Sequence, residues 1–211
     1  MRTLYFLIRY SGGGCASLYG DNQPEGKPTR VGATVKDITE YVIENHLECL
    51  KNIKDQDRMT RTILNLPNMP QFREIRHIDG DYTLKTEDAY KHFEDSIATI
   101  CDFDRRDYLY EVPYRTMIKT GFPNLITAGR TAAADGYAWD VLRVIPPAIL
   151  TGQAAGIASV MAIDTQTDIY KINITELQER LEAQNVMIHF DDALVPQQEQ
   201  EDTIAHVEGH F

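Results

Sequence analysis

Two arginines flank a stretch of the chain that has the features of an anion site. Gly129 and Arg130 follow the short apolar run 125–128, and Arg143 stands just before two prolines. A glycine at the end of a strand lets the backbone turn closely past a ligand, and arginine carries a permanent positive charge. If the connecting loop folds back, both charges reach one neighbourhood. These residues therefore predict a site for an anionic ligand.

The segment after Arg143 predicts a helix with one face of very small residues. Pro146 and Pro147 suit the first turn of a helix, where a missing N–H costs nothing, and the helix is expected over about residues 146–161. Residues 151–156, TGQAAG, give it a face that another body can approach closely. The same pattern also suits a helix packed on a strand, with the arginines in surface ion pairs. The residues alone leave both interpretations open.

The two blocks together resemble a known family. The run NLITAGR, followed after an interval by RVIPPAILTGQAAGIAS, is similar to the C-terminal signature of FAD-dependent oxidoreductases whose flavin domain resembles that of fumarate reductase and glutathione reductase. The segments HIDGDYTL, YEVPYRTMIKTGFPNL and LQERLEAQNVMI also resemble segments of that family. The resemblance covers residues 70–190.

The resemblance implies FAD as the cofactor and two groups of cofactor contacts. In such proteins the strand that ends in Gly-Arg approaches the ribityl-phosphate part of the flavin. The small-residue helix directs its N-terminal dipole at the pyrimidine edge of the isoalloxazine, where negative charge grows on reduction. The first contact is thereby assigned to Gly129 and Arg130. The second is assigned to Arg143, Gly152, Gln153 and Ala154.

The loop between the two blocks, TAAADGYAWD, departs from the family pattern. Relatives commonly carry Cys, Ser or His there, so no catalytic proton-transfer residue is assigned in this chain. Tyr137, Trp139 and Asp140 could line the pocket of a small-molecule substrate, since aromatic residues with a polar atom combine contact area with a hydrogen bond. They could equally belong to the core. The substrate itself stays unassigned.

The glycines near the N-terminus do not supply a site for the ADP part of FAD. Gly12 and Gly14 match the start of G-x-G-x-x-G, but Ser17 replaces the last glycine, and the Gly- and Pro-rich stretch that follows cannot form the required long helix. The chain is therefore expected to be the C-terminal part of a longer enzyme, and by itself it is expected to be inactive and to bind FAD weakly or not at all. The alternative is a stand-alone, non-catalytic domain on the same scaffold, used for protein interaction or for self-association as a homo-oligomer through an exposed apolar surface.

The predicted fold is α+β, with a mixed β-sheet and helices. The resemblance implies that it combines an incomplete remnant of an FAD domain (residues 111–190) with part of a substrate or cap region (residues 1–110). Composition predicts that it ends in a low-order acidic tail (residues 191–211). Periodicity, caps and turn residues predict the individual elements. The expected helices are 35–50, 55–66 and one capped by Thr175. The expected strands are 3–10, two within 72–84, 92–100, 108–118, 125–128 and 185–190.

Composition excludes several classes of function. The net charge of −11 and the absence of a Lys/Arg cluster argue against nucleic acid as a partner. No apolar run approaches the ~20 residues that span a bilayer, and no signal peptide is evident, so a cytoplasmic location without a membrane partner is expected.

The remaining residue patterns predict no metal site. Three widely spaced cysteines, Cys15, Cys49 and Cys101, favour buried thiols over disulfides or C-x-x-C sites. His206 and His210 lie four apart in HVEGH, which matches neither established histidine and glutamate motif. Glu111 and Arg115 share one face of a predicted strand and could pair with each other.

Overall fold

The computed structural model shows a chain that forms two compact units. Unit 1 comprises residues 1–9 and 76–209, and unit 2 comprises residues 10–75 and 210–211. The residues that the structure describes are 8–10, 15–16, 33–54, 59, 71–72, 74–102 and 108–196. The predicted α+β class is confirmed. The predicted division at residue 110 falls inside unit 1. It distinguishes the cap region from the flavin region by function and not by compactness, so it stays a prediction.

Unit 2 contains the long helix α1 (Val35–Lys54) and a short antiparallel pair, β2 (Cys15–Ala16) with β3 (Gln71–Phe72). The Thr34 Oγ1 accepts a hydrogen bond from the Asp37 backbone N–H at 3.1 Å, which caps the start of α1. This confirms the predicted helix over 35–50 and extends it. The predicted helix over 55–66, Met59 apart, and the opening glycines lie outside the described residues.

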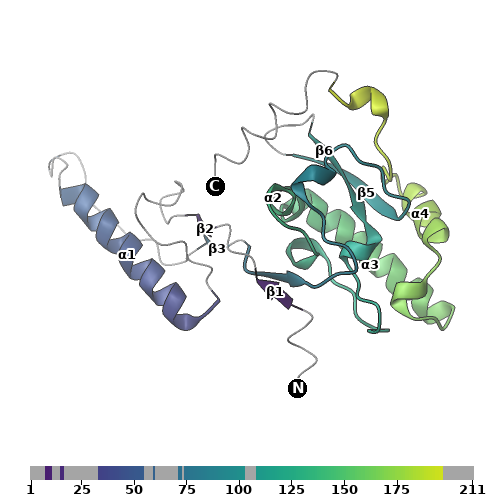
Figure 1. Cartoon of the computed structure of the whole chain (residues 1–211), viewed down its shortest axis with the longest axis horizontal. Helices are drawn as coiled ribbons and strands as arrows, with labels where there is room; N and C mark the ends of the chain where they lie inside the picture. The colour runs from purple at the N-terminus through teal and green to yellow at the C-terminus, as the bar shows by residue number, and fades with distance from the viewer. Residues whose placement is uncertain are drawn as a thin grey trace. The chain divides into compact units, whose positions relative to one another are not determined.

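The central strands of unit 1 are β5 (Ser96–Cys101) and β6 (Leu109–Pro113), which pair antiparallel with Thr99 opposite Glu111 (Figure 1). They confirm the predicted strands over 92–100 and 108–118 in shorter form. The segment 185–190 runs beside β5, where the Met187 carbonyl accepts from the Thr99 N–H at 2.7 Å. It does not form the regular strand predicted for it.

Two other strand predictions need correction. β4 (Arg76–Ile78) pairs with β1 (Ile8–Tyr10) and not with the segment after the Asp79 turn, because Leu84 instead forms a single parallel bridge with Ala134. The predicted buried strand over 125–128 is reduced to one antiparallel bridge between Ile126 and Ile118. Its side chains are half-buried, so it lacks the two covered faces that a buried strand needs.

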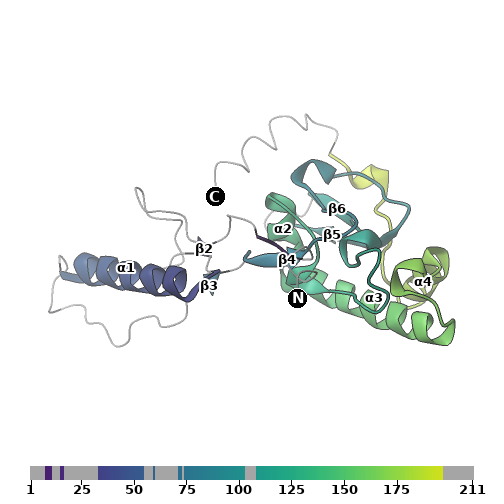
Figure 2. The same cartoon turned by 60° about the horizontal axis from the view of Figure 1, so that its bottom comes forward.

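Three helices follow in unit 1: α2 (Tyr137–Leu142), α3 (Ile145–Asp164) and α4 (Ile174–Glu182). The prediction of α3 is confirmed, with prolines in its first turn, whereas α2 was not predicted. The N-cap of α4 is Asn173, whose side chain accepts from the Glu176 N–H at 3.2 Å, so the predicted cap at Thr175 is wrong. Figures 1 and 2 both show α4 beside α3. Short 3-10 helices complete the unit: η2 (Thr86–Asp88), η3 (Tyr114–Thr116), η4 (Gly129–Thr131), η5 (Ile169–Lys171) and η6 (Asp192–Leu194).

The core of unit 1 lies between the β5–β6 pair and the helices. Its largest fully buried side chains include Trp139, Tyr108 and Tyr110, and α3 contributes the small residues Ala154 and Ala158. Small residues on α3 allow its backbone to approach the neighbouring elements closely. Cys101, in contrast to the prediction of buried thiols, is exposed at the end of β5.

α3 is long and apolar enough to cross a membrane by length and composition, contrary to the expectation from the sequence. Within its most apolar window 28% is buried inside the unit. It contacts η4, β5 and α4. A core helix of a soluble protein passes the same test, so this property alone does not place α3 in a membrane.

Candidate functional site

The turn at Gly129 and Arg130 is attached to the N-terminal half of α3. Gly129 has a φ of +65°, in the left-handed region that favours glycine, and its N–H donates to the Thr151 Oγ1 at 2.8 Å. A Cβ at this position would stand 3.3 Å from the Ala148 Cβ. Both observations show that only glycine fits here without strain or displacement. The turn is therefore a fixed element rather than a loose loop.

Trp139 holds the same turn from the side of α2. Its Nε1–H donates to the Arg130 carbonyl at 3.0 Å, and its ring packs edge-on against His77 with ring centres 4.8 Å apart. The ring is fully buried. Of the other two residues predicted to line a substrate pocket, Tyr137 donates its hydroxyl to the Asp102 carboxylate, and the buried Asp140 pairs with Arg143. The structure thus places Trp139 in the core, where it supports the turn.

The two predicted arginines differ in how their charges are balanced. The Arg143 Nε donates to the Asp140 Oδ1 at 2.8 Å, and the two side chains are largely buried together. Arg130 is exposed, and within the described part of the chain its guanidinium has no ion-pair partner. Arg130 is therefore the one of the two whose charge is available to an anion.

The predicted cofactor residues on α3 face three different surroundings. Gly152 is exposed, with no atom within 4 Å of the place where a Cβ would stand. Gln153 donates to the side chain of Gln184, just after the end of α4, at 2.7 Å, and Ala154 lies in the core. At Gly152, therefore, no side chain covers the backbone of α3.

The first turn of α3 has few backbone N–H groups that could donate to a ligand. Pro146 and Pro147 have no N–H, and the Ala148 N–H donates to the Val144 carbonyl at 3.1 Å. Of the first three residues of α3, only Ile145 carries an N–H. The positive end of the helix therefore acts on a ligand through its field more than through hydrogen bonds.

Comparison with known proteins identifies the family. A family model described as FAD dependent oxidoreductase matches residues 30–181, well over half of the chain. The chain belongs to the FAD-dependent oxidoreductase family. No curated protein and no solved structure matches it. In this family member, the matched region includes the Gly129 turn, α2 and α3.

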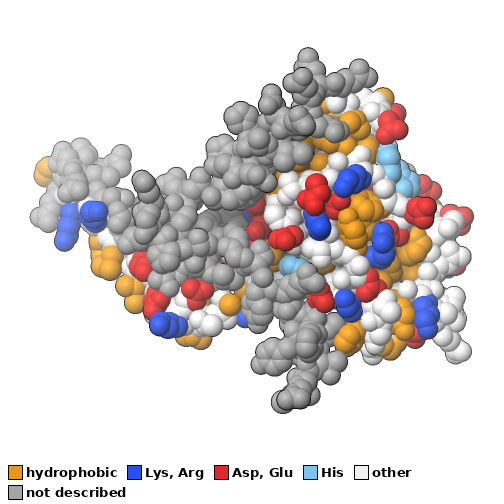
Figure 3. Space-filling view, viewed as in Figure 1, with side chains coloured by type: hydrophobic (Ala, Val, Ile, Leu, Met, Phe, Trp, Pro, Cys, Tyr) orange, Lys and Arg blue, Asp and Glu red, His pale blue; other side chains and the backbone are white. Residues whose placement is uncertain are grey.

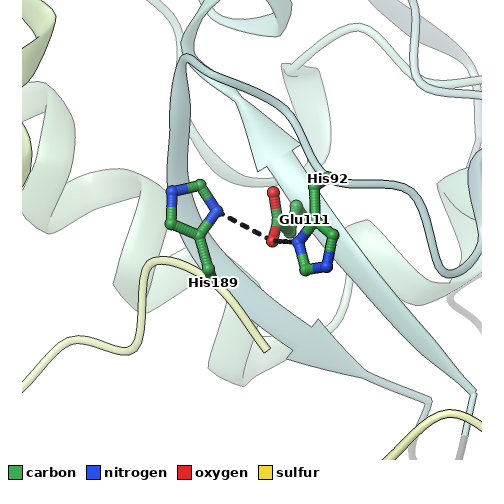
Figure 4. Close-up of side chains that lie close together, drawn as sticks. All are labelled: His92, Glu111 and His189. Atoms are coloured by element: carbon green, nitrogen blue, oxygen red, sulfur yellow. Dashed lines mark hydrogen bonds and ion pairs between the residues drawn. The ribbon is translucent and has the colours of Figure 1, made fainter. Parts of the chain in front are cut away.

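A second group of residues in this oxidoreductase-family chain gathers around Glu111 of β6. The Glu111 carboxylate is fully buried. Its Oε1 lies 2.5 Å from the His92 Nδ1 and 2.9 Å from the His189 Nδ1, and its Oε2 accepts from the Phe93 N–H at 2.7 Å. Figure 4 shows both imidazole rings directed at this one carboxylate. We call His92, Glu111, His189 and the neighbouring Asp192 the histidine cluster.

The two nitrogens of His92 both face carboxylates. The Nε2 lies 2.9 Å from the Asp192 Oδ1, while the Nδ1 faces Glu111. Both nitrogens can donate only if both are protonated, so these contacts favour the imidazolium form. The hydrogen bonds to Asp192 and then to Glu111 raise the pKa of His92 above its ordinary value. The ring also stacks on Phe190, with ring centres 4.3 Å apart.

The sequence prediction for Glu111 is wrong. Arg115 pairs instead with Asp95, through its Nε at 2.9 Å and its Nη2 at 3.0 Å, while Glu111 contacts the histidines. The histidines themselves were not singled out from the sequence, although a signal exists. The tetrapeptides HFED (92–95) and HFDD (189–192) share a His-Phe-acid-acid pattern. His206 and His210 lie outside the described residues.

Proposed function

We propose that residues 111–190 form one part of a flavin site in an oxidoreductase that acts on a small molecule, and that a different polypeptide segment holds the ADP part of FAD. The observation that carries this proposal is the Gly129–Arg130 turn, fixed to α3 within the region that matches the family. FAD, when bound, supplies the electron transfer, while the protein contributes binding and electrostatics.

The residues present fit this role in three places. Gly129 brings the backbone of the turn close to α3. Arg130 offers an exposed guanidinium, the group best suited to a phosphate. Gly152 leaves an uncovered patch of helix backbone. On this segment a phosphate can thus meet an exposed positive charge, and a ring system can meet uncovered helix backbone.

Other predicted residues are assigned a supporting part. Arg143 is neutralised by Asp140, and Gln153 is engaged by Gln184. The Arg143–Asp140 pair lies at the C-terminal end of α2, and the Gln153–Gln184 bond joins α3 to the segment that follows α4. The negative charge that grows on a reduced flavin would then be met chiefly by the α3 dipole, while Arg130 would meet the phosphate.

The first test is the coding sequence directly upstream of the Met1 codon. The proposal expects an in-frame stretch that encodes a strand, a G-x-G-x-x-G turn and a helix. A stop codon upstream, followed by a ribosome-binding site, would contradict the proposal of an ADP-binding segment in the same polypeptide.

The second test uses the protein that includes this upstream segment. Arg130→Ala should weaken FAD binding, measured by quenching of flavin fluorescence. Arg180→Ala is the matched control, because Arg180 is an exposed arginine of α4 that pairs with Glu176. Equal FAD affinity in both variants would remove Arg130 from the cofactor contact.

A non-catalytic role in self-association is the second candidate, and one observation favours it. The outer side of α3 exposes Ile145, Ile149, Val160 and Ile163, each between 52% and 75% exposed. An apolar row of this kind is typical of an interaction surface. Light scattering of the chain should then show dimers that dissociate on Ile149→Asp. A monomer at high concentration would count against this role.

A further inference from the structure

We propose that His92, His189 and Glu111 form a binding site for a first-row divalent cation, with Zn²⁺ the best-suited ion. The ligand atoms of these three residues all lie within 4.8 Å of one another. They come from three separate segments of unit 1, and the ring nitrogens face the same carboxylate oxygen (Figure 4). This site is independent of the flavin role proposed above.

The donor set has the chemistry that zinc prefers. Two imidazole nitrogens and one carboxylate oxygen are the protein ligands of many zinc sites that keep a fourth position open. A tetrahedral ion with bonds of about 2.0–2.1 Å holds its donors about 3.3 Å apart. The present separations from the Glu111 Oε1 are 2.5 Å and 2.9 Å. Shifts of the two rings that widen both of these separations, and set the two ring nitrogens at the same spacing from each other, would therefore create the geometry.

The rings have room for such shifts, and an ion has a path to them. The His92 and His189 side chains are 43% and 46% exposed, whereas Glu111 is fully buried. Figure 3 shows histidine side chains beside acidic ones on the visible surface of this unit. A rigid buried carboxylate with two half-exposed imidazoles leaves the fourth coordination position to solvent.

Two of the three proposed ligands are also oriented by hydrogen bonds to residues outside the ligand set. Asp192 accepts from the far nitrogen of His92, as in the carboxylate–histidine–metal arrangement that orients a ligating ring, and Zn²⁺ would replace the proton on the near nitrogen. The Phe93 N–H holds the second oxygen of Glu111 and leaves Oε1 for the ion. These contacts explain why the ligand atoms converge before any ion is added. The sequence shows no local metal motif because the three ligands come from three separate segments of the chain.

The test is zinc binding by the complete chain after dialysis against a chelator. Because His206 and His210 are possible competing ligands, the reference chain carries His206→Ala and His210→Ala. We expect calorimetry to show one equivalent of Zn²⁺ bound, and Co²⁺ to give the visible absorption of a tetrahedral site. His189→Ala should lower Zn²⁺ affinity by more than about 100-fold, and Asp192→Asn by about 10-fold, the range seen for loss of a supporting hydrogen bond.

The matched control is His46→Ala, which removes a histidine of α1 in unit 2 and should leave Zn²⁺ affinity unchanged. Circular dichroism checks that each variant is folded. His189 is half-exposed, so its replacement is expected to preserve the fold even if a Glu111 variant does not. The proposal is overturned if the folded reference chain binds no stoichiometric Zn²⁺, or if His189→Ala binds it with unchanged affinity.

Discussion

The Gly129–Arg130 turn and the histidine cluster, both in unit 1, are assembled in opposite ways. The hydrogen bonds that fix the turn join residues 22 positions apart, at Thr151, and 9 positions apart, at Trp139. Those of the cluster span 19, 78 and 100 positions. The Gly129–Arg130 turn is formed by residues of one continuous stretch of sequence. The histidine cluster forms only when distant segments come together in the folded chain.

The two regions also differ in the groups that they offer. The turn presents backbone and one exposed arginine, and its shape depends on apolar packing around Trp139. The cluster presents ionisable side chains around a buried carboxylate, and its shape depends on charge and hydrogen bonds. Substitutions should therefore separate a region governed by packing from one governed by electrostatics.

The largest effect is expected from Trp139→Ala. Loss of a fully buried indole should lower the free energy of unfolding by about 3–5 kcal/mol, because a cavity replaces the ring and the Arg130 carbonyl loses its donor. Denaturant unfolding followed by circular dichroism measures it. Trp139→Phe, which keeps most of the ring but removes the N–H, should cost much less. Similar losses in the two variants would mean that packing does not govern the turn.

A smaller effect is expected from Glu111→Gln in the cluster. The amide keeps the size of the side chain but loses the charge, and it turns one acceptor into a donor that faces either a histidine or the Phe93 N–H. The expected loss is about 1–3 kcal/mol in the free energy of unfolding. Glu179→Gln, at an exposed position of α4, is the control and should be near neutral. If both variants melt like the parent chain, the cluster does not contribute to stability.

The smallest effects are expected from two glycine-to-alanine substitutions that should change the free energy of unfolding in opposite directions. Gly129→Ala should destabilise by roughly 1–2 kcal/mol, because its φ of +65° strains any residue with a Cβ. Gly152→Ala should stabilise by roughly 0.5–1 kcal/mol, since it fills open space in a helix. Thermal melting of both variants gives the comparison. A stabilising Gly129→Ala would show that the turn has no fixed conformation.

How much of this could be read from the sequence depends on how local each feature is. The prolines and small residues of α3, and the apolar spacing of α1, predicted both helices. α2 was missed because its six residues lie in an Ala- and Gly-rich loop, and only tertiary packing of Trp139 makes them helical. Glu111 was singled out with the wrong partner. Spacing within one strand could not show that Asp95 would attract Arg115, or that His189 would return to Glu111.

The most direct test of the flavin proposal is a titration of the isotope-labelled chain with FAD, followed by the backbone amide resonances in NMR spectra. The proposal predicts that the amide signals of Gly129, Arg130 and Ile145 shift progressively at high FAD concentration, while those of His92 and His189 stay in place. Shifts confined to other parts of the chain would contradict the assignment of the Gly129–Arg130 turn to the cofactor.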